Sequence, residues 1–238
     1  TKALEYGQKV LQLAPNNTLV RNALSAIYAQ TGEFNKAMEQ IQEIQKIQPD
    51  NPNIHLTLGI IYLGQQEYDK AIEAAEKAIE QNPENLLPYD TLGRAYLAQK
   101  VYDKALDSFK MALEREPEYV PALLGLGSLY GTQGQYFDAF SYYTRVLDIN
   151  PETSEAHLGL GGVYRMTGHQ ALALAEFEKI LTYQPKSSLV LFNAADLALQ
   201  LQKYDDAIAY SSRLLTENPQ HINAQYILAQ AYLSKGEV

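Results

Sequence analysis

Glycines gather in one short stretch of this sequence, where they could form a phosphate-binding loop. Residues 123–136 read LLGLGSLYGTQGQY and include Gly125, Gly127, Gly131 and Gly134. A glycine-rich phosphate loop must follow a β-strand and open a helix. Whether these glycines could bind a nucleotide therefore depends on the elements that surround them.

The histidines are the other residues that could carry chemistry. His55, His157, His169 and His221 lie far apart in the chain, and the sequence has no cysteine. Metal ligands show clustered spacing, and no paired carboxylate motif is present either. We therefore expect packed or solvated histidines, no metal site, no cofactor and no enzyme activity.

The composition excludes some classes of binding partner but does not indicate the cellular compartment. The 238 residues are 46% apolar and carry a formal charge of −9. Nucleic acids and anionic membranes require basic surfaces, so neither is an expected partner. No run of about 18 apolar residues predicts insertion into a membrane, and the polar opening TKALEYGQKV predicts no signal peptide. The absence of cysteine fits the cytoplasm and the bacterial periplasm equally.

A period of 34 residues organises the chain. Seven of the ten prolines are spaced by 34 residues: Pro15, Pro49, Pro83, Pro117, Pro151, Pro185 and Pro219. Such regular spacing indicates an internal repeat, which must be settled before any other feature is interpreted.

Each repeat reads as two helices joined by a turn. With the proline as position 32, alanine always occupies position 20, a small residue position 8, and tyrosine position 11 except at Ala198. Positions 4, 7, 8 and 11 form one helix face, and positions 20, 24, 27 and 28 form a second. The small residue at position 8 is expected to face the alanine at position 20. Predicted N-caps of the second helices are Asn35, Asp69, Asp103 and Asp205, and those of the first helices are Asn17, Asn51, Asn85, Thr153 and Ser187.

These positions resemble the tetratricopeptide repeat family along the whole chain. The residues that carry the resemblance are Leu58-Gly59, Leu92-Gly93, Leu126-Gly127 and Leu160-Gly161 at positions 7–8, with Phe109, Tyr143 and Phe177 at position 24. The resemblance implies an all-α fold, a right-handed superhelical solenoid of antiparallel helix pairs.

The repeat register predicts one solenoid over residues 1–238. Its expected parts are a half repeat at 1–17, full repeats at 18–51, 52–85, 86–119, 120–153, 154–187 and 188–221, and a half repeat at 222–238. Because solenoids normally end in a polar capping helix, the two half repeats suggest a fragment of a longer protein.

The repeat also answers the nucleotide question. Residues 123–136 belong to the first helix and turn of the fourth full repeat, with no strand before them, so a phosphate loop is excluded. Gly127 serves helix packing at position 8, and Gly134 lies in the turn. Gly125, Gly131, Gly159 and Gly162 have no place in the repeat pattern, although each glycine inside a helix costs about 0.5–1 kcal/mol relative to alanine.

The resemblance implies that the first helices line a concave groove. The predicted groove residues are Asn22, Asn53, Leu56, Ile60, Asp90, Arg94, Leu97, Leu124, Gly125, Ser128, Gly131, Leu158, Gly159, Gly162, Arg165, Met166, Phe192, Asn193, Asp196, Tyr226 and Gln230. This surface is apolar with scattered amides and nearly balanced charges. Two interpretations of the four unexplained glycines stay open: they form a shallow floor that lets a partner's backbone or helix come close, or a stable array simply tolerates them.

Three functions fit these features. The first is a protein-binding scaffold whose groove holds a partner's extended peptide or amphipathic helix. The second is a partner- or substrate-docking arm of a larger enzyme, or of a bacterial envelope or secretion assembly. The third is self-association through the uncapped ends.

Overall fold

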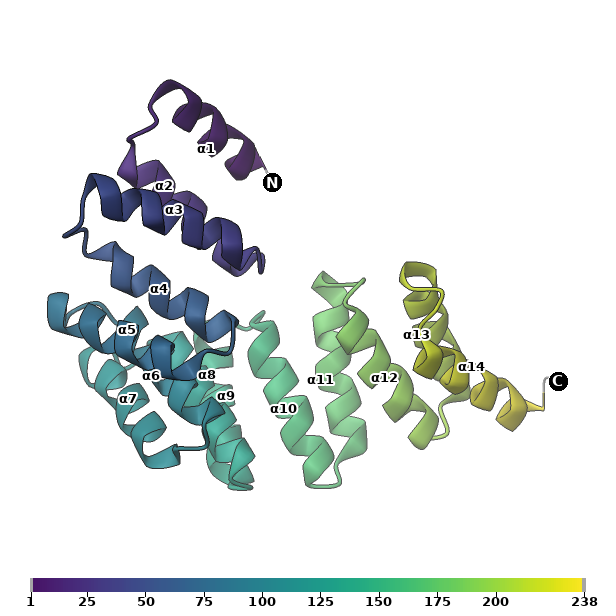
Figure 1. The fold of residues 1–238 in the computed structure, drawn as a ribbon. Helices are drawn as coiled ribbons and strands as arrows, with labels where there is room; N and C mark the ends of the chain where they lie inside the picture. The colour runs from purple at the N-terminus through teal and green to yellow at the C-terminus, as the bar shows by residue number, and fades with distance from the viewer. Residues whose placement is uncertain (1, 237–238) are drawn as a thin grey trace. The chain divides into compact units, whose positions relative to one another are not determined.

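The computed structural model describes residues 2–236, so the first residue and the last two residues of the predicted half repeats lie outside it. Fourteen α-helices and no β-strand occur within this range (Figure 1). The first helices of the repeats are α2 (Thr18–Gln30), α4 (Asn53–Gly64), α6 (Leu87–Ala98), α8 (Val120–Thr132), α10 (Ser154–Met166), α12 (Ser188–Gln200) and α14 (Ile222–Lys235). The second helices are α1 (Lys2–Leu13), α3 (Phe34–Ile47), α5 (Tyr68–Gln81), α7 (Tyr102–Arg115), α9 (Tyr136–Ile149), α11 (Gln170–Tyr183) and α13 (Tyr204–Glu217).

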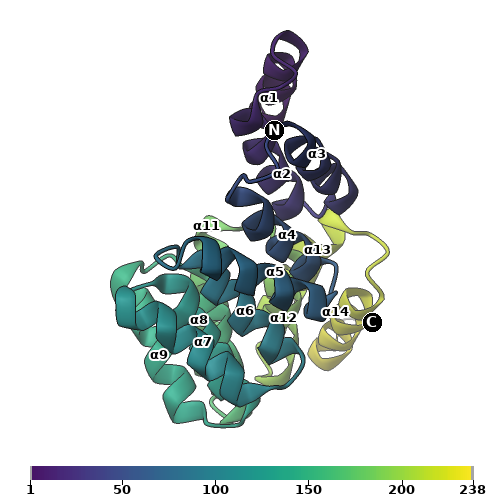
Figure 2. The same ribbon diagram turned by 60° about the vertical axis from the view of Figure 1, so that its left-hand side comes forward.

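The chain forms two compact units, residues 1–125 and 126–238, and the division falls within α8. In the first unit, α4 packs against its partner α5 and against α6, the first helix of the next repeat. In the second unit, α12 contacts α13 and α14 in the same way. Figure 2 shows the successive helix pairs from a second direction. The all-α fold of consecutive helix pairs is therefore confirmed.

Each unit has its own apolar core between paired helices. In the first unit, Leu24, Ile41, Ile44, Ile54 and Ile61 are buried together. In the second unit, the buried cluster extends from α11 to α14; examples are Phe177, Leu191, Leu197, Leu214 and Ile227. The position-20 alanines from α3 to α13 are all fully buried: Ala37, Ala71, Ala105, Ala139, Ala173 and Ala207.

The position-8 glycines make two kinds of contact. A Cβ atom added to Gly59 would lie 3.7 Å from the backbone oxygen of Ala71, so this glycine does face the alanine at position 20. In the next three repeats, the added Cβ would instead overlap the ring at position 24. The expected glycine–alanine contact is thus replaced by a glycine–ring contact at Gly93, Gly127 and Gly161.

Two of the unexplained glycines pack against the same rings from the following repeat. The ring of Phe109 is fully buried, and a Cβ atom at Gly93 or Gly125 would overlap it. The ring of Tyr143 lies in the same way against Gly127 and Gly159. The prediction of an open floor is therefore wrong at Gly125, which is buried. At Gly159, which is half-buried, the ring of Tyr143 occupies the space where a side chain would be.

The predicted caps of the second helices are also wrong. These helices begin at the aromatic residue before the predicted cap; for example, α5 begins at Tyr68 rather than after Asp69, and its cap residue Glu67 makes no side-chain cap bond. At the first helices, Asn17 accepts a hydrogen bond from the backbone N–H of Val20 as predicted. Thr153 and Ser187 occupy the cap positions without such a bond.

Candidate partner-binding site

In residues 2–125, the predicted groove residues form a mixed surface. Asn53 and Arg94 are exposed, whereas Asn22, Leu56, Ile60, Leu97 and Leu124 are half-buried. The amide nitrogen and oxygen of Asn22 are buried and have no hydrogen-bond partner within the described residues. Half-exposed aliphatic side chains therefore alternate with amide and charged groups on these first helices.

Asp90 and Arg94 form an ion pair along α6. The Asp90 side chain is almost fully buried, and Nε of Arg94 lies 3.0 Å from its Oδ1 and 2.9 Å from its Oδ2. Burial raises the pKa of the Asp90 carboxyl, and the nearby Arg94 charge opposes that shift. Burial also raises the pKa of the neighbouring Tyr119 to about 12, aided by the Asp90 charge.

In residues 126–236, five predicted residues line one hollow of about 270 Å³: Ser128, Gly131, Gly159, Gly162 and Met166. It lies among α8, α9 and α10. A Cβ atom at Gly162 would meet no atom within 4 Å, and one at Gly131 would meet only Ala139, at 3.9 Å. These two glycines, unlike Gly125 and Gly159, leave open space.

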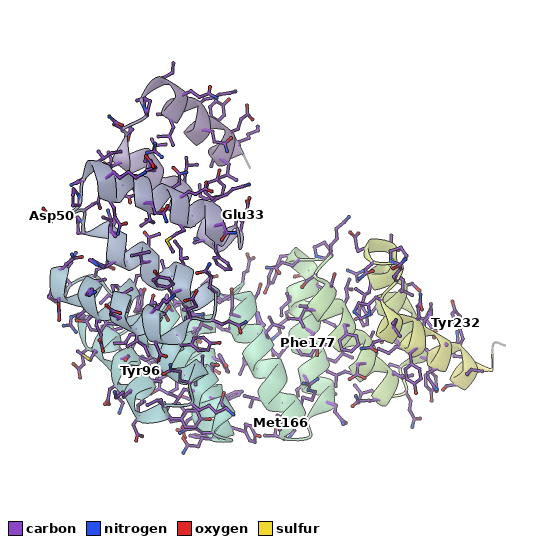
Figure 3. All side chains as sticks on the ribbon, viewed as in Figure 1. Glu33, Asp50, Tyr96, Met166, Phe177 and Tyr232 are labelled. Atoms are coloured by element: carbon purple, nitrogen blue, oxygen red, sulfur yellow. The ribbon has the colours of Figure 1, made fainter. Side chains whose placement is uncertain are left out.

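An apolar side chain lies at the rim of the hollow, and the cationic residue before it in the sequence reaches toward α12. Met166 lies at the end of α10 (Figure 3). It is 63% exposed. The preceding residue, Arg165, is exposed, and its Nη1 lies 3.4 Å from the amide oxygen of Asn193 on α12. This oxygen accepts the bond, while the Asn193 amide nitrogen donates to the carbonyl of Leu189.

The remaining predicted residues are spread over α10, α12 and α14. Leu158 is half-buried, and the ring of Phe192 packs against that of His221 at 5.6 Å between centroids. Asp196 accepts a hydrogen bond from Gln200. Tyr226 is 63% exposed, and its hydroxyl lies 3.4 Å from Nε2 of Gln230.

Sequence reasoning missed three residues of the hollow: Tyr136, Tyr143 and Val163. Tyr143 was identified only as a repeat residue at position 24, because its dual role depends on the missing side chain of Gly159. Burial raises the pKa of Tyr143 to about 12, so its hydroxyl stays neutral at physiological pH.

His157 belongs to the interior. Its Nδ1 lies 2.6 Å from Oε2 of Glu176, and its Nε2 donates to the carbonyl of Pro151 at 2.9 Å. Across residues 2–236, no three His, Cys, Asp or Glu side chains are grouped as a metal ion requires. No helix in that range combines the length and apolar character needed to cross a bilayer.

Family models support this arrangement. Models described as tetratricopeptide repeat match residues 1–61, 52–85, 91–152, 124–188 and 192–238. The chain belongs to the tetratricopeptide repeat family. No curated protein sequence matches this tetratricopeptide repeat chain.

Solved structures of other proteins share its fold. A chain of the APC/C hetero-tetramer Cut9-Hcn1 is 20% identical with a TM-score of 0.77; the match covers 98% of this tetratricopeptide repeat chain but only 46% of that one. PilW, a type IV pilus biogenesis factor, is 22% identical with a TM-score of 0.72, covering 89% and 98%. Pseudomonas aeruginosa pilF is 19% identical with a TM-score of 0.68, covering 90% and 97%. At these identities the likeness concerns the fold alone.

Proposed function

We propose that this chain is a protein-binding scaffold and that the groove face of its first helices holds a partner's extended peptide or amphipathic helix. The hollow at Gly131 and Gly162 is the observation that carries the proposal. It is an open space on the first helices α8 and α10, uncharged along its lining, with an exposed methionine at its rim. An apolar side chain of a partner would displace water from it and bury Met166, which is favourable.

Filling the hollow tests this proposal. A random dodecamer peptide library is panned against the chain, and the selected peptides are measured against Gly162→Leu. We expect this variant to keep its fold, because no atom lies within 4 Å of the new Cβ, and to bind at least about tenfold more weakly, because the leucine occupies the partner's space.

Ser141→Leu is the matched control, because it adds the same side chain at an exposed position on α9, a second helix of the same unit. This control should bind as the unmodified chain does. If the selected peptides bind the unmodified chain and Gly162→Leu equally well, the peptides bind outside the hollow.

A second candidate is a docking component of a bacterial envelope assembly. Its support is the likeness to PilW, described as a type IV pilus biogenesis factor. A cross-linking experiment tests this function. The Gly162→Cys variant carries a cross-linker at the introduced cysteine and is mixed with solubilised bacterial envelope proteins. A specific cross-link from this position to a subunit of an envelope assembly would support the docking function. The absence of any cross-link to such subunits would count against it.

A further inference from the structure

The floor of the hollow resembles the glycine pair that holds a buried ring, one helical turn away. The ring of Tyr143 lies against Gly127 on α8 and Gly159 on α10. Gly131 follows Gly127 by four residues and Gly162 follows Gly159 by three, and residues with these spacings are neighbours on a helix surface. A Cβ atom at Gly162 would meet no atom within 4 Å, and one at Gly131 would meet only an alanine methyl group. This second glycine pair therefore has space for a ring, and no ring of the described residues fills it.

The hydroxyl group of Tyr143 is a second feature of the hollow. Tyr143 lines the hollow and is only 8% exposed. Its Cζ atom, which carries the hydroxyl, is the ring atom nearest to a Cβ atom placed at Gly159. Because Gly159 also lines the hollow, the hydroxyl points into it. Within residues 2–236 this hydroxyl has no hydrogen-bond partner.

Packing of the ring does not require this hydroxyl. Phe109 occupies the same position of the preceding repeat and lies against Gly93 and Gly125 in the same way. A buried hydroxyl without a partner costs free energy, which a phenylalanine would avoid. Burial also raises the pKa of Tyr143 to about 12, so the hydroxyl keeps its proton. The hollow thus contains one hydrogen-bond donor that the fold does not use.

The occupant of such a hollow needs a flat apolar body with a neutral oxygen at its tip. Val163 and Met166 offer apolar contacts, and a thioether sulfur packs favourably against an aromatic ring. No charged side chain is among the described residues that line the hollow, so a carboxylate would be buried there without a counter-charge. Tyrosine fits, because it joins a large apolar ring to a neutral hydroxyl that can accept a hydrogen bond.

We propose that the hollow at Gly131 and Gly162 binds a tyrosine side chain of the partner, with its ring on the glycine floor and its phenolic oxygen accepting a hydrogen bond from the Tyr143 hydroxyl. This inference rests on the proposed function, since it names the partner side chain that occupies the same site. Tyr143 then determines specificity, because its hydroxyl distinguishes tyrosine from phenylalanine.

A peptide selection with two matched variants tests the inference. The dodecamer library is panned against the unmodified chain, and the binders are measured against Tyr143→Phe and Tyr183→Phe. Each variant removes a hydroxyl that has no hydrogen-bond partner among the described residues, but Tyr183 lies at the end of α11 and does not line the hollow. We expect binders enriched in tyrosine. Their affinity should fall at least about threefold in Tyr143→Phe and stay unchanged in Tyr183→Phe.

Urea unfolding separates a binding role of the hydroxyl from a structural one. Tyr143→Phe should be at least as stable as the unmodified chain, because Phe109 packs in the same way without a hydroxyl. A destabilised Tyr143→Phe would mean that the hydroxyl supports the fold, and it would overturn the proposed role in binding.

A double-mutant cycle then locates the contact. Replacing the tyrosine of a selected peptide by phenylalanine should weaken its binding to the unmodified chain at least about threefold. The same replacement should have little further effect on Tyr143→Phe, because the hydrogen bond is already lost. Additive losses in the cycle would refute a contact between the two hydroxyls.

The outcomes separate the two proposals. Binders that lose affinity in Gly162→Leu but not in Tyr143→Phe, without enrichment in tyrosine, would leave the groove function standing and refute the tyrosine occupant. Binders indifferent to both variants, or a selection that yields no binder, would count against both.

Discussion

At the scale of single residues, the glycines of α10 have two different roles. Gly159 lies against the ring of Tyr143, whereas Gly162, one turn further on, faces open space. A helical glycine is therefore required in one case and only tolerated in the other. The difference arises from the tyrosine of the preceding repeat.

Alanine substitutions at these two glycines should change stability in opposite directions. Gly159→Ala should lower the free energy of unfolding by about 1–3 kcal/mol, because the methyl group overpacks against a buried ring. Gly162→Ala should raise it by about 0.5–1 kcal/mol through helix propensity alone. Urea unfolding of both variants measures the effects. A stabilised Gly159→Ala would show that the tyrosine ring is free to move away.

His157 and Glu176 form a second residue-scale feature. Both are buried, and Glu176 also accepts a hydrogen bond from Lys179 at 2.9 Å. Leu123 and Leu191 occupy the same repeat position as His157 in neighbouring repeats and are fully buried there. This repeat position therefore accepts an aliphatic side chain, provided that Glu176 is not left buried without its partner.

Replacing both members of this pair should destabilise the chain less than the two single replacements added together. Glu176→Leu should destabilise the chain by about 3–5 kcal/mol, because buried polar groups lose their partner. His157→Leu with Glu176→Leu should be less damaging than the sum of the single variants by at least about 2 kcal/mol. Chemical unfolding of the four proteins completes the cycle. Additive costs would mean that the two side chains act independently.

At the scale of the helix pair, the turn between the two helices imposes one unusual backbone conformation. Position 15 of the repeat has a positive φ in each repeat from α2 to α14, at Gly32, Gly134, Gly168 and Gly236 and also at Gln66, Lys100 and Gln202. Only glycine adopts this region without cost, since the Cβ of other residues approaches the carbonyl oxygen. The three non-glycine turns therefore carry strain.

Exchanging residues at position 15 should expose that strain. Lys100→Gly should stabilise the chain by about 1 kcal/mol, because φ is 62° at this turn, and Gly134→Lys should destabilise it by a similar amount, because φ is 75° there. Thermal unfolding at a fixed protein concentration provides the comparison. A destabilised Lys100→Gly would mean that the lysine side chain contributes more than its backbone costs.

At the scale of the whole molecule, the acidic charge lies mostly away from the predicted groove. The net charge is −9, and exposed carboxylates pair with lysines along the second helices, as Glu73 does with Lys77 on α5. Such exposed pairs contribute little to stability. They maintain a charged outer face that disfavours acidic ligands there.

Partner binding in the groove should depend only modestly on salt. The hollow proposed to hold the partner has an uncharged lining, so affinity should change less than about tenfold between low and high ionic strength. Isothermal titration with a selected peptide at several salt concentrations measures this. A steeper fall would identify the acidic second helices as the true binding surface.

The repeat, and with it the fold, could be predicted from the amino-acid sequence. The spacing of Pro15, Pro49 and their successors, together with the helical periodicity of apolar residues, located each helix pair, because local chain stops and one apolar face per helix suffice to define this unit. The first helices begin at or one residue after the predicted repeat starts, from Thr18 to Ile222. The role of a residue could likewise be predicted from the sequence where it depends only on spacing along one helix.

The contacts between side chains of successive repeats could not be predicted from the sequence. The rings of Phe109 and Tyr143 occupy the space where side chains of Gly125 and Gly159 would be, because the ring of one repeat reaches the first helix of the next. Whether a glycine leaves a hollow or seats a ring depends on a neighbour 16 residues earlier, and no periodicity within one helix records that contact. The hollow at Gly131 and Gly162 and the position of Arg165 beside Asn193 likewise arise only when helices of successive repeats pack together.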